Sequence, residues 1–97
     1  MYKISDDIKE LSFKGLQIHR LIKTDALEIL SISLEKGTIF PEHVSPKEAQ
    51  LLVLEGDIDF HIDHKKYNIT AQQHFNFPEE KKHWVKANKN SKFLIIR

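Results

Sequence analysis

Residues 37–56 read GTIFPEHVSPKEAQLLVLEG, and residues 77–84 read FPEEKKHW; these two stretches decide how the chain folds. Gly37 and Gly56 stand where strands end in turns, and turns that need a positive φ favour glycine. Pro78 fits a loop that fixes the approach to the strand after it. The two stretches therefore predict the two halves of one small β-barrel.

Strand patterns continue on both sides of these stretches. In residues 57–63, DIDFHID, apolar and polar residues alternate with the two-residue period of a strand that has one solvent-exposed face. The following residues, HKKYNI, predict a second strand that turns back on the first as a hairpin. Earlier, LQIHRLI and ALEILSISLE predict two more strands, separated by a turn at residues 23–25 and ended at residues 36–37. Ser5 predicts the cap of a short helix that ends at Gly15. We expect an all-β barrel with a short N-terminal helix.

Composition limits the class of protein. The chain has 97 residues, 40% of them hydrophobic and 30% charged, as in ordinary globular proteins. This length predicts a single domain over residues 1–97. No apolar run is long enough to span a bilayer and the N-terminus carries acids, so we expect a cytoplasmic protein without a membrane partner. Because the chain has no cysteine, a metal would need His, carboxylate or amide ligands.

Charge and apolar patterns bear on the partners of the chain. Residues 81–97 carry six basic side chains and no acid, but lysines also keep sheet edges from pairing, and no nucleic-acid-binding motif accompanies them. We expect no nucleic-acid partner. Residues 51–54, LLVL, are apolar on both strand faces, so the second face needs another strand, a helix or a second subunit as a cover. This pattern predicts a homodimer.

The spacing of five residues resembles the two motifs of the cupin superfamily. Its first motif runs Gly, five residues, His, one, His, three or four, Glu, six, Gly, and Gly37, His43 and Gly56 fall in register with it. Its second motif runs Gly, five residues, Pro, one, Gly, two, His, three, Asn, which Pro78 and His83 match. The resemblance covers about residues 34–87, with motifs at 37–56 and 72–87, and implies a double-stranded β-helix, or jelly-roll, barrel. The motif positions that differ are occupied by Ser45, Ala49, Gln72, Glu80 and Ala87.

The resemblance also implies where a site would lie. Cupins that bind a metal typically hold it with two His and a Glu from the first motif and a His from the second. Ser45 and Ala49 replace the second His and the Glu, which leaves His43 and His83 as the metal-ligand candidates. His43 and Ser45 are two apart and are expected on the inward face of one strand. The candidate residues of a ligand pocket are His43, Ser45, Ala49, Phe60 and His83.

Two imidazoles hold a divalent ion only weakly unless further donors join them. The nearest extra donors are Glu48, Gln50 and His74. Strand parity points Glu48 and Gln50 away from the cavity unless a bulge turns one inward, and leaves the face of His74 open. The other histidines, His19, His61 and His64, are expected at the surface.

Three functions follow from this site. The loss of two ligands favours a small-molecule-binding, sensing or accessory module that binds a small organic ligand, is non-catalytic or weakly catalytic, and carries no cofactor or a weakly bound divalent metal ion. The alternative is a metal-dependent enzyme, dioxygenase- or isomerase-like, with a centre rebuilt from His43, His83 and an extra donor; only family analogy supports this reaction class. A third class, a structural interaction protein, would use the LLVL face and Trp84 for assembly.

Overall fold

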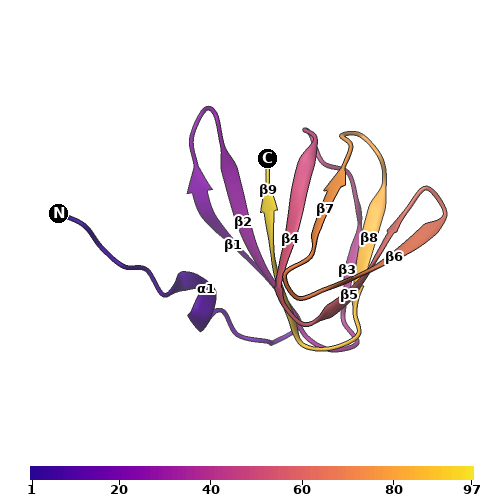
Figure 1. Ribbon diagram of the computed structural model, residues 1–97, viewed down its shortest axis with the longest axis horizontal. Helices are drawn as coiled ribbons and strands as arrows, with labels where there is room; N and C mark the ends of the chain where they lie inside the picture. The colour runs from indigo at the N-terminus through magenta and orange to yellow at the C-terminus, as the bar shows by residue number, and fades with distance from the viewer.

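The computed structural model describes all of residues 1–97, which form nine strands and one short helix. The strands are β1 (Leu16–Lys23), β2 (Glu28–Leu34), β3 (Ile39–His43), β4 (Ala49–Glu55), β5 (Asp57–Ile62), β6 (Lys65–Thr70), β7 (His74–Phe77), β8 (His83–Ala87) and β9 (Ser91–Ile96). Antiparallel pairing joins them into a five-stranded sheet, β1-β2-β9-β4-β7, and a four-stranded sheet, β3-β8-β5-β6. The two sheets face each other as the halves of a barrel (Figure 1). The all-β jelly-roll barrel expected from the sequence is confirmed.

The N-terminal helix is shorter than predicted. Helix α1 (Asp7–Glu10) begins after Ser5, whose Oγ accepts a hydrogen bond from the backbone N–H of Asp7 at 3.1 Å. Leu11 is already extended, so the predicted end at Gly15 is wrong. The Lys92 ammonium donates to two carbonyls of the helical turn, which it can do only because the chain after the turn lies along the sheet. No helix of the chain is long and apolar enough to cross a membrane.

Apolar side chains from the inward faces of both sheets form the core. On β5, Ile58, Phe60 and Ile62 are buried, while the polar residues between them are partly exposed, which confirms the alternation read from the sequence. The three largest buried side chains are all phenylalanines: Phe60, Phe77 and Phe93. Three phenylalanine rings are therefore the largest members of a core whose other side chains are aliphatic.

The motif positions impose an unusual backbone at the turns. Gly37 and Gly56 have φ angles of 84° and 100°, as their turns predicted. Gly56 also lies against the start of β9, since a Cβ atom there would be 2.6 Å from the Cα atom of Ser91. Gln72 and Glu80, which occupy the two glycine positions of the second motif, have φ angles of 68° and 63°. The backbone has thus kept conformations that glycine adopts most easily.

The two surfaces suggested for assembly lie on opposite sides of the barrel. On β4, Leu51 and Val53 point into the core, while Leu52 and Leu54 are half-buried on the outer face of the five-stranded sheet. Trp84 lies between two buried residues of β8, on the outer face of the other sheet. An interaction protein that used both LLVL and Trp84 would therefore need two separate contact surfaces, because strand pairing puts them on different sheets.

Candidate functional site

The two motif histidines meet inside one sheet. His43 ends β3 and His83 begins β8, and the two residues are direct partners in the strand pairing. Their Nε2 atoms are 2.9 Å apart, with the ring centroids at 4.2 Å. A bulge between Phe40 and His43 adds one residue to β3, so that both side chains face inward. The structure thus brings together the two residues that the motifs singled out.

The backbone orients both imidazole rings. The Nδ1 atom of His43 is 2.7 Å from the carbonyl oxygen of Pro41, and the Nδ1 atom of His83 is 3.0 Å from that of Lys81. A carbonyl oxygen only accepts, so each Nδ1 must carry the hydrogen. The two Nε2 lone pairs then point at each other, and their contact is favourable only when a proton or a cation lies between them.

Aromatic rings surround the pair. The Phe60 ring lies nearly parallel to the His83 ring at 5.1 Å, and the Phe77 ring contacts His83 at 4.7 Å between centroids. At the outer end of the pair, Phe40 stacks on His43 at 4.3 Å. Three phenylalanine rings therefore contact the histidine pair.

The protonation of His83 follows from its surroundings. Its side chain is 2% exposed, and burial lowers its pKa below the usual value of 6.5. The bond to the Lys81 carbonyl opposes this shift, while the nearby His43 and Arg97 add to it. Burial of the ring therefore favours the neutral form of the His83 imidazole.

Ser45, two residues after His43, belongs to a buried ionic network that no sequence motif revealed. The residue follows β3 in the loop rather than on the strand, yet it is buried. Its hydroxyl donates to the Lys47 carbonyl at 2.6 Å and accepts from the Arg97 guanidinium at 3.3 Å. Arg97 also donates to Glu28 at 2.7 Å, and Arg20 lies 3.1 Å from the other oxygen of that carboxylate. Within this network two guanidinium groups share a single carboxylate.

The hydrogen bond from Arg97 holds the pKa of Glu28 below its usual value, against the effect of burial. Glu28 is 7% exposed, so two arginines share one carboxylate that has little contact with water. No local pattern could have identified these residues, because Glu28 and Arg97 are 69 positions apart in the chain.

The extra donors do not reach the histidine pair. Ala49 is fully buried and has no donor atom, while Glu48 is exposed in the loop. Gln50 and His74 lie on the outer face of the five-stranded sheet, where His74 Nε2 contacts Gln50 Oε1. Strand parity directs them away from the interior that holds His43 and His83. Nowhere does the chain gather three His, Cys, Asp or Glu side chains able to hold one metal ion, so the four-ligand centre of the motifs does not fit it.

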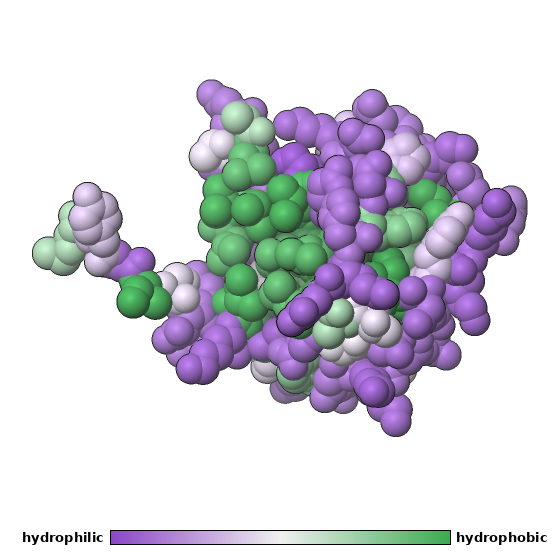
Figure 2. All heavy atoms as spheres, viewed as in Figure 1, coloured by the Kyte–Doolittle hydropathy of each residue, from purple (hydrophilic) through white to green (hydrophobic).

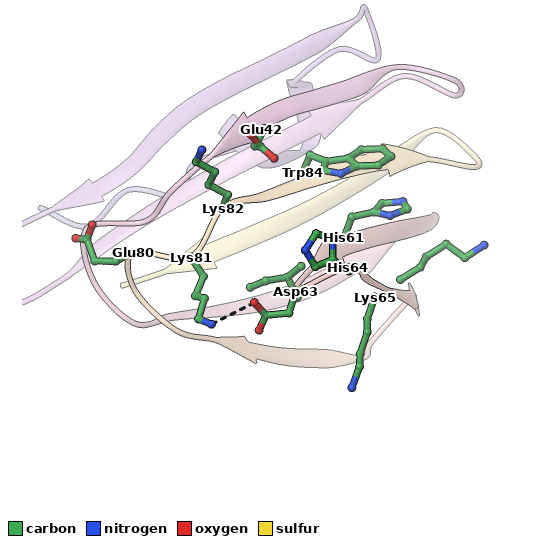
Figure 3. A pocket seen from close by; sticks show the side chains of 11 residues that line it. Glu42, His61, Asp63, His64, Lys65, Glu80, Lys81, Lys82 and Trp84 are labelled. Atoms are coloured by element: carbon green, nitrogen blue, oxygen red, sulfur yellow. Dashed lines mark hydrogen bonds and ion pairs between the residues drawn. The ribbon is translucent and has the colours of Figure 1, made fainter.

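Two hollows lie on the outside of the barrel. The larger, about 590 Å³, lies between the β5–β6 hairpin, the β7–β8 loop and β3 (Figure 3). In it the His61 ring stacks on Trp84 at 3.6 Å, and Lys81 pairs with Asp63 at 3.2 Å. The smaller hollow, about 510 Å³, lies beside β6 and β7. None of the five predicted pocket residues lines either hollow.

The remaining predicted surface histidines have local partners or none. His64 is exposed in the β5–β6 turn, and His19 on β1 pairs with Asp7 at 3.2 Å. His61 is half-buried because of its stacking on Trp84.

Comparison with known proteins agrees with this architecture. Residues 30–96 match a family model described as a cupin domain. The conserved SPY1581 protein of unknown function from Streptococcus pyogenes has a similar structure, with a TM-score of 0.85 at 24% identity over 99% of this chain and 86% of that chain. A cupin superfamily protein from Desulfitobacterium hafniense, DSY2733, gives 0.86 at 17% identity over 99% and 90%. KdgF from Halomonas sp. gives 0.75 at 18% identity over 84% and 76%. These likenesses concern the fold alone, and the sequence matches no curated protein.

Proposed function

This chain belongs to the cupin superfamily, and from that premise we propose that it is a small-molecule-binding module whose ligand presents an anionic group to the barrel end with His43, His83 and Arg97. The observation that supports this proposal is the excess of guanidinium groups in the buried network, where Arg20 and Arg97 share the carboxylate of Glu28 and Arg97 also reaches Ser45. The module acts in sensing or as an accessory protein, without the metal-dependent catalysis of four-ligand cupins.

The chemistry of the site favours a carboxylate. A guanidinium recognises a carboxylate through parallel hydrogen bonds, and Arg97 has donors left after its bonds to Glu28 and Ser45. A carboxylate at this end would also stabilise a proton held between the two Nε2 atoms. His43 is partly exposed at the mouth, and Val44 beside it is 44% exposed, so an apolar ligand body has a surface to contact. The packed apolar core places the proposed ligand at the mouth rather than deep in the barrel.

Nuclear magnetic resonance titration tests this proposal. The probes are acetate and succinate, each compared with its uncharged amide, and the readout is the imidazole nitrogen shifts of His43 and His83. The acids are expected to shift both rings to saturation, whereas the amides leave them unchanged. Arg97→Gln is expected to weaken succinate binding about ten- to 150-fold, since a hydrogen bond to a charged group contributes about 1.5–3 kcal/mol. His64→Gln is the matched control, and equal binding of the acids and their amides would refute the proposal.

A second candidate is the metal-dependent enzyme, dioxygenase- or isomerase-like, with a divalent ion on His43 and His83. The specific observation in its favour is that both Nδ1 atoms donate to backbone carbonyls, as metal-binding histidines commonly do. With only two imidazoles and Arg97 nearby, we expect such an ion to be weakly held. Elemental analysis of protein purified without chelators tests this candidate. A near-stoichiometric transition metal that is lost in His83→Gln and kept in His64→Gln would favour the enzyme over the binding module.

A further inference from the structure

The larger hollow on the outside of the barrel is built from polar side chains. Its volume of about 590 Å³ falls within the range of about 300–1,000 Å³ that is usual for sites of small ligands. Figure 2 shows hydrophilic side chains over the end of the molecule that carries the β5–β6 hairpin, whereas apolar side chains gather over β1, β2 and β9. Only two of the 11 residues that line the hollow are hydrophobic, so a ligand that fills it must be polar.

A stacked pair of rings forms one wall of this hollow. Trp84 on β8 and His61 on β5 are direct partners in the strand pairing, and their rings are parallel within 2°. Lys66 on β6 is the partner of His61 on its other side, so the three side chains form a row across adjacent strands. Both rings are half-buried and hold each other in place. A flat ring of a ligand can therefore stack on this ring pair with little loss of side-chain freedom.

The hairpin side of the hollow is basic. His64, Lys65 and Lys66 follow one another at the β5–β6 turn, and neither lysine forms an ion pair. Asp63, the acid that precedes them, is already paired with Lys81 at 3.2 Å (Figure 3). Lysine ammonium groups are common ligands of phosphate, which they bind as point charges. This side of the hollow is therefore suited to an anion.

The two remaining carboxylates belong to the other side of the hollow. Glu42 lies on β3 and Glu80 on the β7–β8 loop, and Figure 3 shows both well away from Lys65. Both side chains are exposed, and neither forms an ion pair. An ionised carboxylate only accepts hydrogen bonds. This side is therefore suited to the N–H and O–H groups of a ligand.

The backbone of the hollow is strained where these side chains stand. Asp63, His64 and Glu80 have φ angles of 52°, 60° and 63°, and they are three of the four non-glycine residues with positive φ in the chain. Asp63 and His64 are the two residues of the β5–β6 turn, a position where Asn-Gly is favoured. All three side chains are exposed, so no packing in the core offsets the strain. Strained residues gather at functional sites, where the side chain itself has a role.

We propose that this hollow binds a phosphorylated compound with a planar nitrogen heterocycle, of the class of the nucleoside monophosphates. The heterocycle stacks on the ring pair, and the phosphate lies beside Lys65 and Lys66. The carboxylates of Glu42 and Glu80 accept hydrogen bonds from the rest of the ligand. A phosphate carries close to two negative charges at neutral pH, which matches two unpaired lysines better than a single carboxylate does. The site is outside the barrel and does not depend on the ligand proposed for the mouth.

The fluorescence of Trp84, the only tryptophan of the chain, reports on this hollow. The probe is adenosine monophosphate, and adenosine and ribose phosphate are measured in competition with it. We expect saturable quenching by adenosine monophosphate. Each competitor is expected to bind at least about tenfold more weakly, because it lacks either the phosphate or the stacking ring. Quenching that does not saturate, or equal affinity for adenosine and its monophosphate, would overturn the proposal.

Variants with matched charge test the residues. Lys65→Gln with Lys66→Gln is expected to raise the dissociation constant of adenosine monophosphate at least about tenfold. Lys36→Gln with Lys89→Gln, the same loss of charge at the opposite end of the barrel, is expected to leave it unchanged. His61→Ala is expected to weaken adenosine monophosphate about tenfold and to leave ribose phosphate unaffected. Circular dichroism verifies that the variants fold. Equal losses in the two lysine pairs, or unchanged binding in His61→Ala, would refute the assignment.

Discussion

Replacing Gly56 by alanine is expected to destabilise the barrel much more than the same change at Gly37. Both residues have positive φ, so alanine at either position adds a backbone strain of about 1–2 kcal/mol to the folded state. Alanine also reduces the conformational freedom of the unfolded chain, which offsets about 0.4–1 kcal/mol of that loss. Only at Gly56 does the new Cβ meet other atoms, since it would lie 2.6 Å from both Ser91 Cα and the Asn90 carbonyl oxygen. At Gly37 no atom lies within 4 Å.

The clash at Gly56 involves backbone atoms of the turn into β9, which cannot rotate away as a side chain can. Forcing β4 and β9 apart adds about 1–3 kcal/mol, as other overpacked positions do. We therefore expect a loss of about 2–4 kcal/mol for Gly56→Ala and about 1 kcal/mol for Gly37→Ala, which corresponds to melting temperatures lower by about 10–25 °C and about 5 °C. Urea unfolding followed by circular dichroism measures both. Equal losses in the two variants would refute the reasoning, because they would show that φ strain alone matters.

Three further predictions concern the second motif and the buried ionisable groups. Gln72→Gly and Glu80→Gly are each expected to stabilise the protein by about 0.5–1 kcal/mol in urea unfolding, because both residues have positive φ and glycine adopts it without strain. Burial lowers the pKa of His83 in the folded protein, so on acidification the unfolded chain takes up this proton at a higher pH than the folded chain does. The free energy of unfolding is therefore expected to fall as the pH decreases from about 7 through the folded pKa. His83→Gln is expected to reduce this pH dependence, which the urea midpoint at each pH measures. Glu28 also has a lowered pKa, so its contribution is present above 4.5 and lost as pH falls further, and Glu28→Gln is expected to remove that acid loss.

Each of these predictions has a control. Glu79→Gly, next to Glu80 but without positive φ, is expected to destabilise the protein, and stabilisation by this variant as well would contradict the role of strain. For the titrations, His64→Gln should keep the slope near neutral pH. The assignment to His83 would be contradicted if His64→Gln removed this pH dependence of stability, or if the native protein became more stable on acidification.

Much of the fold could be predicted from the sequence because its signals are local. The alternation in β5 and the apolar sequence of β4 depend only on the two-residue period of a strand, and Gly37 and Gly56 stand where tight turns need them. The pairing of His43 with His83 could also be anticipated, because it follows from the spacing of two motifs in one fold. In contrast, the end of α1 could not, because the Lys92 ammonium that contacts its last turn is more than 80 positions away.

The details of the candidate site were decided by tertiary structure. A one-residue bulge in β3 turns His43 inward, and such a bulge depends on how β3 pairs with β8. Gln50 and His74 became partners on the outer face because β4 pairs with β7 in one particular register.

By itself, then, the sequence determined the strands, their turns and the two histidines, all of which follow from patterns within a few residues or from motif spacing. Only the tertiary structure decided that aromatic rings fill the space beside His83 and that Arg97 reaches Ser45. It also decided that the apolar side of β4 and Trp84 face opposite ways. The physical reason is that a strand's period says which side chains share a face, whereas the register and order of the strands decide what each face meets.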